Sequence, residues 1–426
     1  MDTLLGNDEP HYYAVFGSGI KGVGPRIPFW SAPASDLTEW TFLGALWEPT
    51  DNSSFGPLLS TGSNGYNFEV SGFFSLPDSK GDLHYFVNMG SEQPSGDIQF
   101  HPSNHFALWE EGTVSRRENG SAQFTPVAAG LGDWGLSYAL TSFVDKKHGN
   151  RRVQWAWTPE DLVGAGGLFS ATQQGFQGSL ALPRELFVSE VTNVVDPDGS
   201  LAAAKDAVLV DNGDGTFTAQ TLGVKPLPDV VAGIRAGTTH KTYASGTHTS
   251  SSILQQAGSS HFELKATIKS TTGAAGVIIG ASSDGVEYTT IIYEPSDHTI
   301  LFERLHSSTI VEFNNATVTG FFHPHTIKSG ATSAPEDINM TVFVDGSLVE
   351  VYINDRFALA SRIYPSKECS TGFGVYVADG ASAEFAGVEA WLDTLNVWPG
   401  RPLNSSSPLL QDTIAQTNNG SWWAGN

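Results

Sequence analysis

The sequence predicts an all-β protein, and three observations support this prediction. Helical periodicity is scarce, and 46 glycines and 22 prolines separate short runs in which apolar and polar residues alternate. Hydrophobic residues make up 40% of the chain and aromatic residues 11%, which is enough for packed cores. A length of 426 residues predicts two domains of roughly 200 residues each.

The first region contains short alternating runs that are typical of repeated small sheets, although no exact sequence repeat is visible. The predicted strands are Tyr12–Phe16, Leu83–Val87, Leu136–Val144, Val153–Trp157 and Gly178–Leu182. Turn residues then concentrate in residues 191–216, where Asp196-Pro197-Asp198-Gly199 and Asp211-Asn212-Gly213-Asp214-Gly215 occur. These residues predict a connector between two domains, 1–190 and 217–400.

The second region predicts a β-sandwich. Its predicted strands are His261–Ser270, Gly276–Gly280, Tyr288–Glu294, Thr299–Glu303, Met340–Val344 and Leu348–Ile353. The last two are expected to form a hairpin around Asp345-Gly346, because a tight turn favours this pair where its central residues need positive φ. The tail, residues 401–426, is expected to be loose.

Charge and cysteine content exclude several classes of partner. The formal net charge is −23, which repels phosphate backbones and anionic membrane surfaces, so no nucleic-acid or membrane partner is expected. No apolar run approaches the roughly 20 residues that span a bilayer. Cys369 is the only cysteine, so neither an internal disulfide nor a thiolate metal cluster can form.

The predicted location rests on sequons for N-glycosylation, which matter only for a chain that enters the secretory route. Six occur, at Asn52, Asn119, Asn315, Asn339, Asn404 and Asn419. The first residues, Met-Asp-Thr-Leu-Leu-Gly-Asn-Asp, have no basic region and no long apolar core, so they are not a signal peptide. One resolution is an extracellular full-length form whose true N-terminus is missing from this chain.

Two motifs imitate ligand sites but fail on context. The segment from Gly17 to Gly22 matches G-x-G-x-x-G, yet the residues after it, including Pro25, cannot begin the helix that a phosphate requires. It is therefore predicted to be a glycine-rich turn. His101 and His105 have a spacing that suits metal ligands only on a helix, and Pro102 favours a loop. No metal and no cofactor are expected.

Glu69 is the strongest catalytic candidate. Phe68, Val70, Phe73 and Phe74 surround it in sequence and predict partial burial, which raises a carboxyl pKa and suits a proton donor. The alternative is a surface glutamate beside a turn. Four tryptophans offer ring faces on which sugars can stack, but aromatic residues at strand spacing are more often core. These are Trp109, Trp134, Trp155 and Trp157.

Four segments in order, spread over about residues 10 to 400, resemble glycoside hydrolase family 32, the invertase, inulinase and levanase group that includes fungal fructosyltransferases. Asn67-Phe68-Glu69-Val70 resembles the acid/base segment, although Cys often follows the glutamate in the family and Val70 stands here. The other three are similar, respectively, to the stretch that closes the catalytic domain, to another segment of the family and to the C-terminal sandwich. They are Gly175–Leu186, Asp145–Trp157 and residues 342–365.

The resemblance implies a five-bladed β-propeller followed by a β-sandwich. It also implies retaining hydrolysis or transfer of fructosyl units from sucrose or fructans, with a carboxylate nucleophile and an acid that protonates the leaving oxygen. Glu69 matches the acid/base residue, and Glu92, His105 and Tyr138 match sugar-contacting positions, for each of which a purely structural role is the alternative.

In the family the nucleophile lies in an Asn-Asp-Pro-type motif and a second aspartate in an Arg-Asp-Pro motif. The only Asp-Pro here is Asp196-Pro197. We therefore expect an incomplete propeller without the first blade and the inner strand of the second, and a nearly inactive chain. The alternatives are a non-catalytic carbohydrate-binding protein and an unrelated structural β-protein, which leaves the four ordered motifs unexplained. The sequence does not separate hydrolysis from transfer, or sucrose from inulin and levan.

Overall fold

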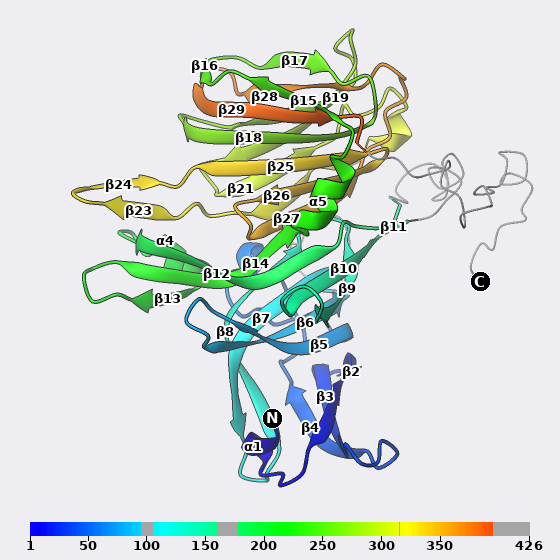
Figure 1. The fold of residues 1–426 in the computed structure, drawn as a ribbon, viewed down its shortest axis with the longest axis vertical. Helices are drawn as coiled ribbons and strands as arrows, with labels where there is room; N and C mark the ends of the chain where they lie inside the picture. Colours follow the sequence, from blue (N-terminus) through cyan, green and yellow to red (C-terminus); the bar gives the residue numbers. More distant parts are fainter. Residues whose placement is uncertain (95–104, 161–177, 315, 395–426) are drawn as a thin grey trace, which may run out of the picture.

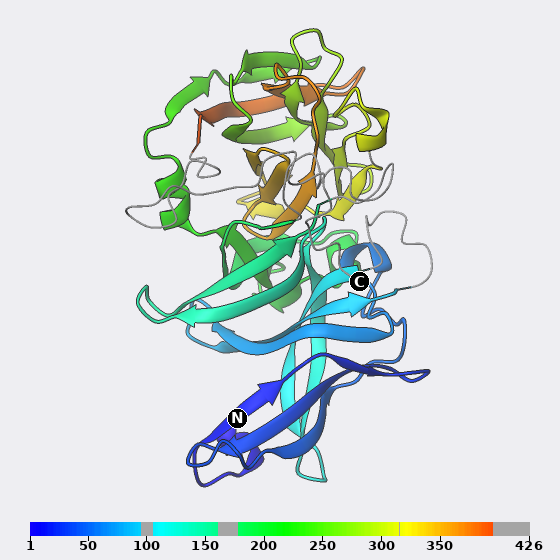
Figure 2. The same ribbon diagram turned by 90° about the vertical axis from the view of Figure 1, so that its right-hand side faces the viewer.

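The computed structural model describes residues 1–94, 105–160, 178–314 and 316–394. These residues are mostly strands, arranged as three small sheets below a two-sheet sandwich (Figures 1 and 2). Within the described ranges, no helix is long and apolar enough to cross a membrane. The helices in these described ranges are α1 (Asp2–Leu5), α2 (Leu58–Thr61), α4 (Ser200–Ala204), α5 (Pro228–Ile234) and the 3-10 turn Val311–Phe313. The all-β prediction is confirmed.

The first sheet has only three strand positions. It contains β1 (His11–Val15), β2 (Ser18–Ile20), β3 (Gly24–Pro33) and β4 (Thr41–Trp47). β1 and β2 follow each other along one edge of β3, and β4 pairs with the opposite edge. Among the described residues, no strand pairs with the free edge of β1. The glycine-rich segment forms β2 and the turn into β3, as the turn interpretation predicts.

The second sheet is a four-stranded antiparallel meander. It contains β5 (Asn67–Pro77), β6 (Leu83–Glu92), β7 (His105–Arg116) and β8 (Ala122–Asp133). The third sheet follows it and contains β9 (Tyr138–Asp145), β10 (Arg151–Thr158), β11 (Ser179–Leu180), β12 (Arg184–Val195), β13 (Val208–Asp211) and β14 (Phe217–Pro226).

Residues 191–216, expected to be a connector, instead continue the third sheet. β12 runs to Val195 and β13 pairs with β14. The turn-rich segments are the links between these strands, with α4 inserted in the first of them. The ladder between β12 and β14 reaches Pro226, and the first sandwich strand begins at Thr239.

The three lower sheets match the expected incomplete propeller. The expectation that only one blade and one inner strand are absent implies four propeller sheets, whereas the described residues build three. That part of the expectation is wrong, because the sheet formed by β1 to β4 is itself the incomplete one and only two full sheets follow it.

The sandwich consists of two antiparallel sheets whose facing side chains form a large apolar core. One sheet contains β15 (Thr239–Tyr243), β16 (Gly246–His248), β18 (His261–Thr271), β25 (Ile338–Asp345), β26 (Leu348–Ile353), β27 (Phe357–Arg362) and β29 (Ala383–Leu392). The other contains β17 (Ser252–Gln256), β19 (Ala275–Ala281), β20 (Thr289–Glu294), β21 (Thr299–Glu303), β22 (Val318–Phe321) and β28 (Gly372–Val377).

The predicted hairpin between β25 and β26 is present, but its turn is shifted by one residue. Asp345 pairs with Leu348, so Gly346 and Ser347 form the loop. Gly346 has φ of +61° while Asp345 stays in the strand. The glycine therefore supplies the left-handed conformation alone.

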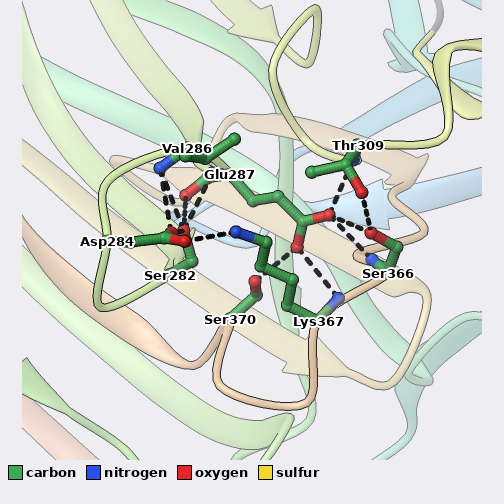
Figure 3. A network of polar contacts seen from close by, with 8 residues as sticks. All are labelled: Ser282, Asp284, Val286, Glu287, Thr309, Ser366, Lys367 and Ser370. Carbon is green, nitrogen blue, oxygen red and sulfur yellow. Dashed lines mark hydrogen bonds and ion pairs between the residues drawn. The ribbon is translucent and has the colours of Figure 1, made fainter.

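A buried carboxylate holds together the loops at one end of the sandwich. Glu287, between β19 and β20, accepts hydrogen bonds from the loop after β21 and the loop after β27 (Figure 3). Its side chain is fully buried. Burial alone raises the pKa of Glu287, but the hydrogen bonds from Ser366, Ser370 and nearby backbone amides outweigh burial and lower this pKa.

A strand pair and a buried network of charges connect the propeller to the sandwich. β23 (Thr326–Ser329) and β24 (Thr332–Pro335) lie in sequence between two sandwich strands, yet β23 pairs with the end of β12 in the third sheet. Arg184 of β12 is fully buried beside two acids, at 2.6 Å from Asp133 and 3.5 Å from Glu350 of the sandwich. Such a buried network fixes the relative position of the two parts, because separating them leaves charges unpaired.

Candidate functional site

The structure brings the four predicted site residues together at neighbouring strand ends. Glu69 lies near the start of β5, Glu92 ends β6, His105 begins β7 and Tyr138 begins β9. In the ladder, Glu92 pairs with both Asn67 and His105. These strands lie side by side in the lower half of the molecule (Figures 1 and 2).

Polar contacts link the members of this cluster. The Asn67 side-chain amide donates to the Glu92 carboxylate at 2.5 Å, and Nε2 of His105 lies 3.9 Å from the same carboxylate. The rings of His105 and Tyr138 meet edge to face, with centroids 5.0 Å apart. The cluster therefore offers a carboxylate, an imidazole and a phenol that can bind the hydroxyls of a sugar.

Glu69 is exposed, so the predicted partial burial is wrong. Phe68 is buried at 1% exposure, but in a strand the next side chain points to the opposite face. Phe68 and Phe74 therefore fill the core, while Glu69 faces a cavity that Val70 also lines.

This cavity has a volume of about 750 Å³ and opens between the first, second and third sheets. Glu69 is the only carboxylate among the described residues that line it. Strand β1, which has one unpaired edge among the described residues, forms one side of the cavity, and β5 and β9 form the others. The lining residues are Tyr13–Gly17, Asn67–Phe73, Asn88, Leu140–Ser142 and Arg152.

Arg152 is a cavity residue that the sequence did not single out. Its guanidinium carbon lies 4.1 Å from the centre of the Phe74 ring, and Nε donates to the Ser142 hydroxyl at 2.9 Å. Burial lowers the pKa of Arg152 to about 10. The Arg151-Arg152 pair is visible in the sequence, but strand alternation alone does not reveal which of the two faces the cavity.

Tyr138 is held in an environment that disfavours its ionised form. Burial is the main cause, and the charges of Glu69 and Glu92 add to it, so the pKa of the phenol is raised. Glu69 is close enough to influence the phenol, although the Tyr138 hydroxyl has no partner at hydrogen-bonding geometry among the described residues. A neutral phenol beside two acids is available to donate to an incoming hydroxyl.

The other sequence candidates have structural positions. Trp109 and Trp134 are buried core residues, Trp155 is half-buried and Trp157 is exposed. His101 lies outside the described residues. No group of three or more potential metal ligands occurs in the parts of the chain that the structure describes.

The described residues thus form an incomplete β-propeller with a polar cluster at neighbouring strand ends, joined to a β-sandwich. The N-terminal domain of glycosyl hydrolases family 32 matches residues 3–197, and the C-terminal domain of the same family matches residues 231–398. The chain belongs to glycosyl hydrolase family 32.

Solved structures agree with this assignment. An Aspergillus kawachii beta-fructofuranosidase complexed with glycerol is 28% identical with a TM-score of 0.83, over 94% of this chain and 70% of that chain. A fructosyltransferase from A. japonicus is 28% identical with a TM-score of 0.82, over 92% and 68% of the two chains. A. japonicus CB05 is 27% identical with a TM-score of 0.84, over 94% and 72%. No curated protein matches the chain.

Proposed function

We propose that the site acts on β-fructofuranosyl linkages of sucrose or fructans, with Glu69 as the acid/base residue. The observation that carries this proposal is that Glu69 lines an open cavity while Glu92, His105 and Tyr138, which do not line it, lie together at neighbouring strand ends. Glu69 faces the cavity, where it can reach the glycosidic oxygen of a bound sugar. Glu92, His105 and Tyr138 bind fructosyl hydroxyls, and neither sucrose nor fructan carries a charge that the acidic protein would repel.

The mechanism that we propose for the complete form is retaining. A nucleophilic carboxylate bonds to C2 of fructose while Glu69 protonates the leaving oxygen, and water or another sugar then accepts the fructosyl unit. Retaining glycosidases hold their two carboxyl groups about 5–5.5 Å apart. Glu69 is the only carboxylate in the described lining of the cavity, and the unpaired edge of β1 runs along the same cavity. A further strand paired with β1 is a suitable carrier of the second carboxylate.

Rescue by azide tests the role of Glu69 in the 426-residue chain. Azide takes the place of the second carboxylate as the nucleophile. Azide attacks C2 of sucrose, the bond from C2 to the glucosyl oxygen breaks, and Glu69 gives its proton to that oxygen. We expect very slow sucrose cleavage alone, and an azide-dependent fructosyl azide of inverted configuration at C2. Glu69→Gln should lower the azide-dependent rate by about 100-fold or more.

Glu185→Gln is a suitable control, because Glu185 lies on β12 and pairs with Lys225 away from the cavity. Two results would count against the proposal. One is brisk sucrose cleavage without azide, which contradicts the need for a second carboxylate. The other is an azide rate that Glu69→Gln leaves unchanged.

The second candidate function is non-catalytic carbohydrate binding, which the single carboxylate in the cavity favours. Calorimetric titration with sucrose and with inulin separates the two functions. Binding that Glu92→Gln weakens, together with no azide product, supports the binding function. An azide product that requires Glu69 refutes it.

We also propose that the complete form is secreted and glycosylated. Asn119 is exposed in the tight turn between β7 and β8, where a glycan can be attached without disturbing a sheet. Expression of the chain behind a secretory leader in yeast, followed by removal of N-glycans, should reduce its mass. Asn119→Gln should remove one of these glycans, and an unchanged mass in the parent chain contradicts the proposal.

A further inference from the structure

Left-handed backbone conformations concentrate directly after the predicted site residues. Among the described residues, eleven non-glycine residues have positive φ, and six of them are Asn or Asp, which tolerate it best. Among the other five, three follow a candidate site residue immediately. These are Val70 after Glu69 (φ 46°), Gln93 after Glu92 (φ 55°) and Ala139 after Tyr138 (φ 53°).

Two of these residues lie in β-bulges. Between Glu69 and Gly72, β5 advances three residues while its partner β6 advances two. Near Tyr138, β9 likewise uses three residues against two of β10. A bulge breaks the strict alternation of side chains and re-aims those beside it. A left-handed β-branched residue such as Val70 also costs conformational energy, so surrounding contacts must enforce it.

The buried side chain of Asn88 lies between the two bulges. Asn88, which is 5% exposed, is the ladder partner of Gly72 at the end of the first bulge. Its amide donates to the carbonyl of Leu140 in the second bulge at 2.8 Å. A Cβ on Gly72 would lie 2.4 Å from Oδ1 of Asn88, so only glycine leaves room for this amide.

The same arrangement seats Tyr138. A Cβ on Gly90 would lie 2.4 Å from the Tyr138 hydroxyl, and Gly90 is the ladder partner of Glu69. The phenol therefore packs on the strand pair that carries Glu69. A shift of the β9 bulge relative to β6 would move this hydroxyl away from both Glu69 and Glu92.

We propose that Asn88 is a positioning residue that locks the two bulges together and so fixes Tyr138 against Glu69. Its consequence for sugar binding rests on the proposed function, but the coupling between Tyr138 and Glu69 can be measured without any sugar.

The full chain labelled with 3-fluorotyrosine provides the measurement. The ¹⁹F resonance of Tyr138 is assigned by its disappearance in Tyr138→Phe, and its shift on Glu69→Gln is recorded in the parent and in Asn88→Asp. This near-isosteric change removes the donor and places an acceptor against the Leu140 carbonyl. We expect the response of Tyr138 to Glu69→Gln to be largely lost in Asn88→Asp, and sucrose binding to weaken by about tenfold.

Gln220→Glu is the matched control, because Gln220 is a buried amide that donates to Glu190 on the outer part of the third sheet. It should lower the melting temperature without changing the response of Tyr138. If Asn88→Asp does not fold, Gly72→Ala tests the same lock from the opposite side, with the same expected loss.

A normal Tyr138 response in a destabilised Asn88→Asp or Gly72→Ala overturns the inference and leaves Asn88 a structural residue. If neither the parent nor the variants bind sucrose, while Asn88→Asp loses the Tyr138 response to Glu69→Gln, the proposed function fails and the inference stands.

Discussion

Replacing Glu287 by glutamine should destabilise the sandwich strongly, although the change alters only one atom and one charge. One carboxylate oxygen accepts from Thr309 N–H at 2.7 Å, from Ser366 N–H at 3.0 Å and from the Ser366 hydroxyl at 2.5 Å. The other accepts from Lys367 N–H at 3.1 Å and from the Ser370 hydroxyl at 2.5 Å. These five bonds tie two loops to the carboxylate of a third (Figure 3).

A glutamine keeps the oxygen that accepts from Thr309 and Ser366, but its NH₂ group faces the Lys367 N–H and the Ser370 hydroxyl, which are both donors. The Ser370 hydroxyl can rotate to accept, whereas the Lys367 N–H loses its partner. Hydrogen bonds to a charged group contribute about 1.5–3 kcal/mol each, so the loss of one or two gives about 3 kcal/mol. In a domain of roughly 150–250 residues this lowers the melting temperature by about 6–12 °C.

The assay is thermal unfolding followed by circular dichroism at neutral and acidic pH. Because the folded pKa of Glu287 is lowered, its stabilisation is present above the unfolded pKa and is lost as pH falls through the folded pKa. The difference between parent and Glu287→Gln should therefore shrink in acid. Asp284→Asn is the control, because Asp284 is exposed and should matter much less. A melting temperature unchanged by Glu287→Gln at neutral pH would refute the reasoning.

Two further predictions concern buried charges in the propeller. Glu110 is 2% exposed, and one of its carboxyl oxygens has no hydrogen-bond partner among the described residues. Burial raises the pKa of Glu110 well above its usual value. The contribution of Glu110 to the stability of the folded state is therefore lost as pH rises above the pKa in the unfolded chain. Glu110→Gln should therefore be more stable than the parent at pH 8 and should lose that advantage toward pH 4, as urea unfolding would show; equal stabilities at both pH values would contradict this. Arg184→Met leaves Asp133 and Glu350 buried without a cation and should cost about 3–5 kcal/mol in the same assay, whereas a cost under about 1 kcal/mol would show that the network is unimportant.

The strands and the two-part organisation could be predicted because alternation and turn residues are local signals. The misreading of residues 191–216 shows the limit of those signals. The Asp- and Gly-rich segments mark turns, but a turn between two paired strands has the same composition as a linker between domains. Only the pairing of β14 with β12, which lies beyond α4 and β13 in sequence, and with β13 as a hairpin distinguishes them.

Of the candidate site residues, only Glu69 was proposed from its sequence surroundings, whereas Glu92, His105 and Tyr138 were proposed through resemblance alone. Glu69 was expected to be partly buried because Phe68 and Val70 flank it, yet Phe68 faces away from it into the core and Val70 is exposed in the bulge that follows. The left-handed conformation of Val70 has no signature in the sequence, since valine is among the residues least suited to it. The sequence also carries no signal for Asn88, because an asparagine within a strand does not indicate that it bridges two bulges.

The hairpin of β23 and β24 has a practical consequence for anyone who divides this protein. A cut between β14 and α5 would separate the two parts in sequence but would carry away the strand that completes one edge of the third sheet. The amides and carbonyls at Val194 and Val195 would then face solvent or another chain. Expression of either half alone should therefore yield a fragment that tends to aggregate. Fusion partners are better placed at other surface turns.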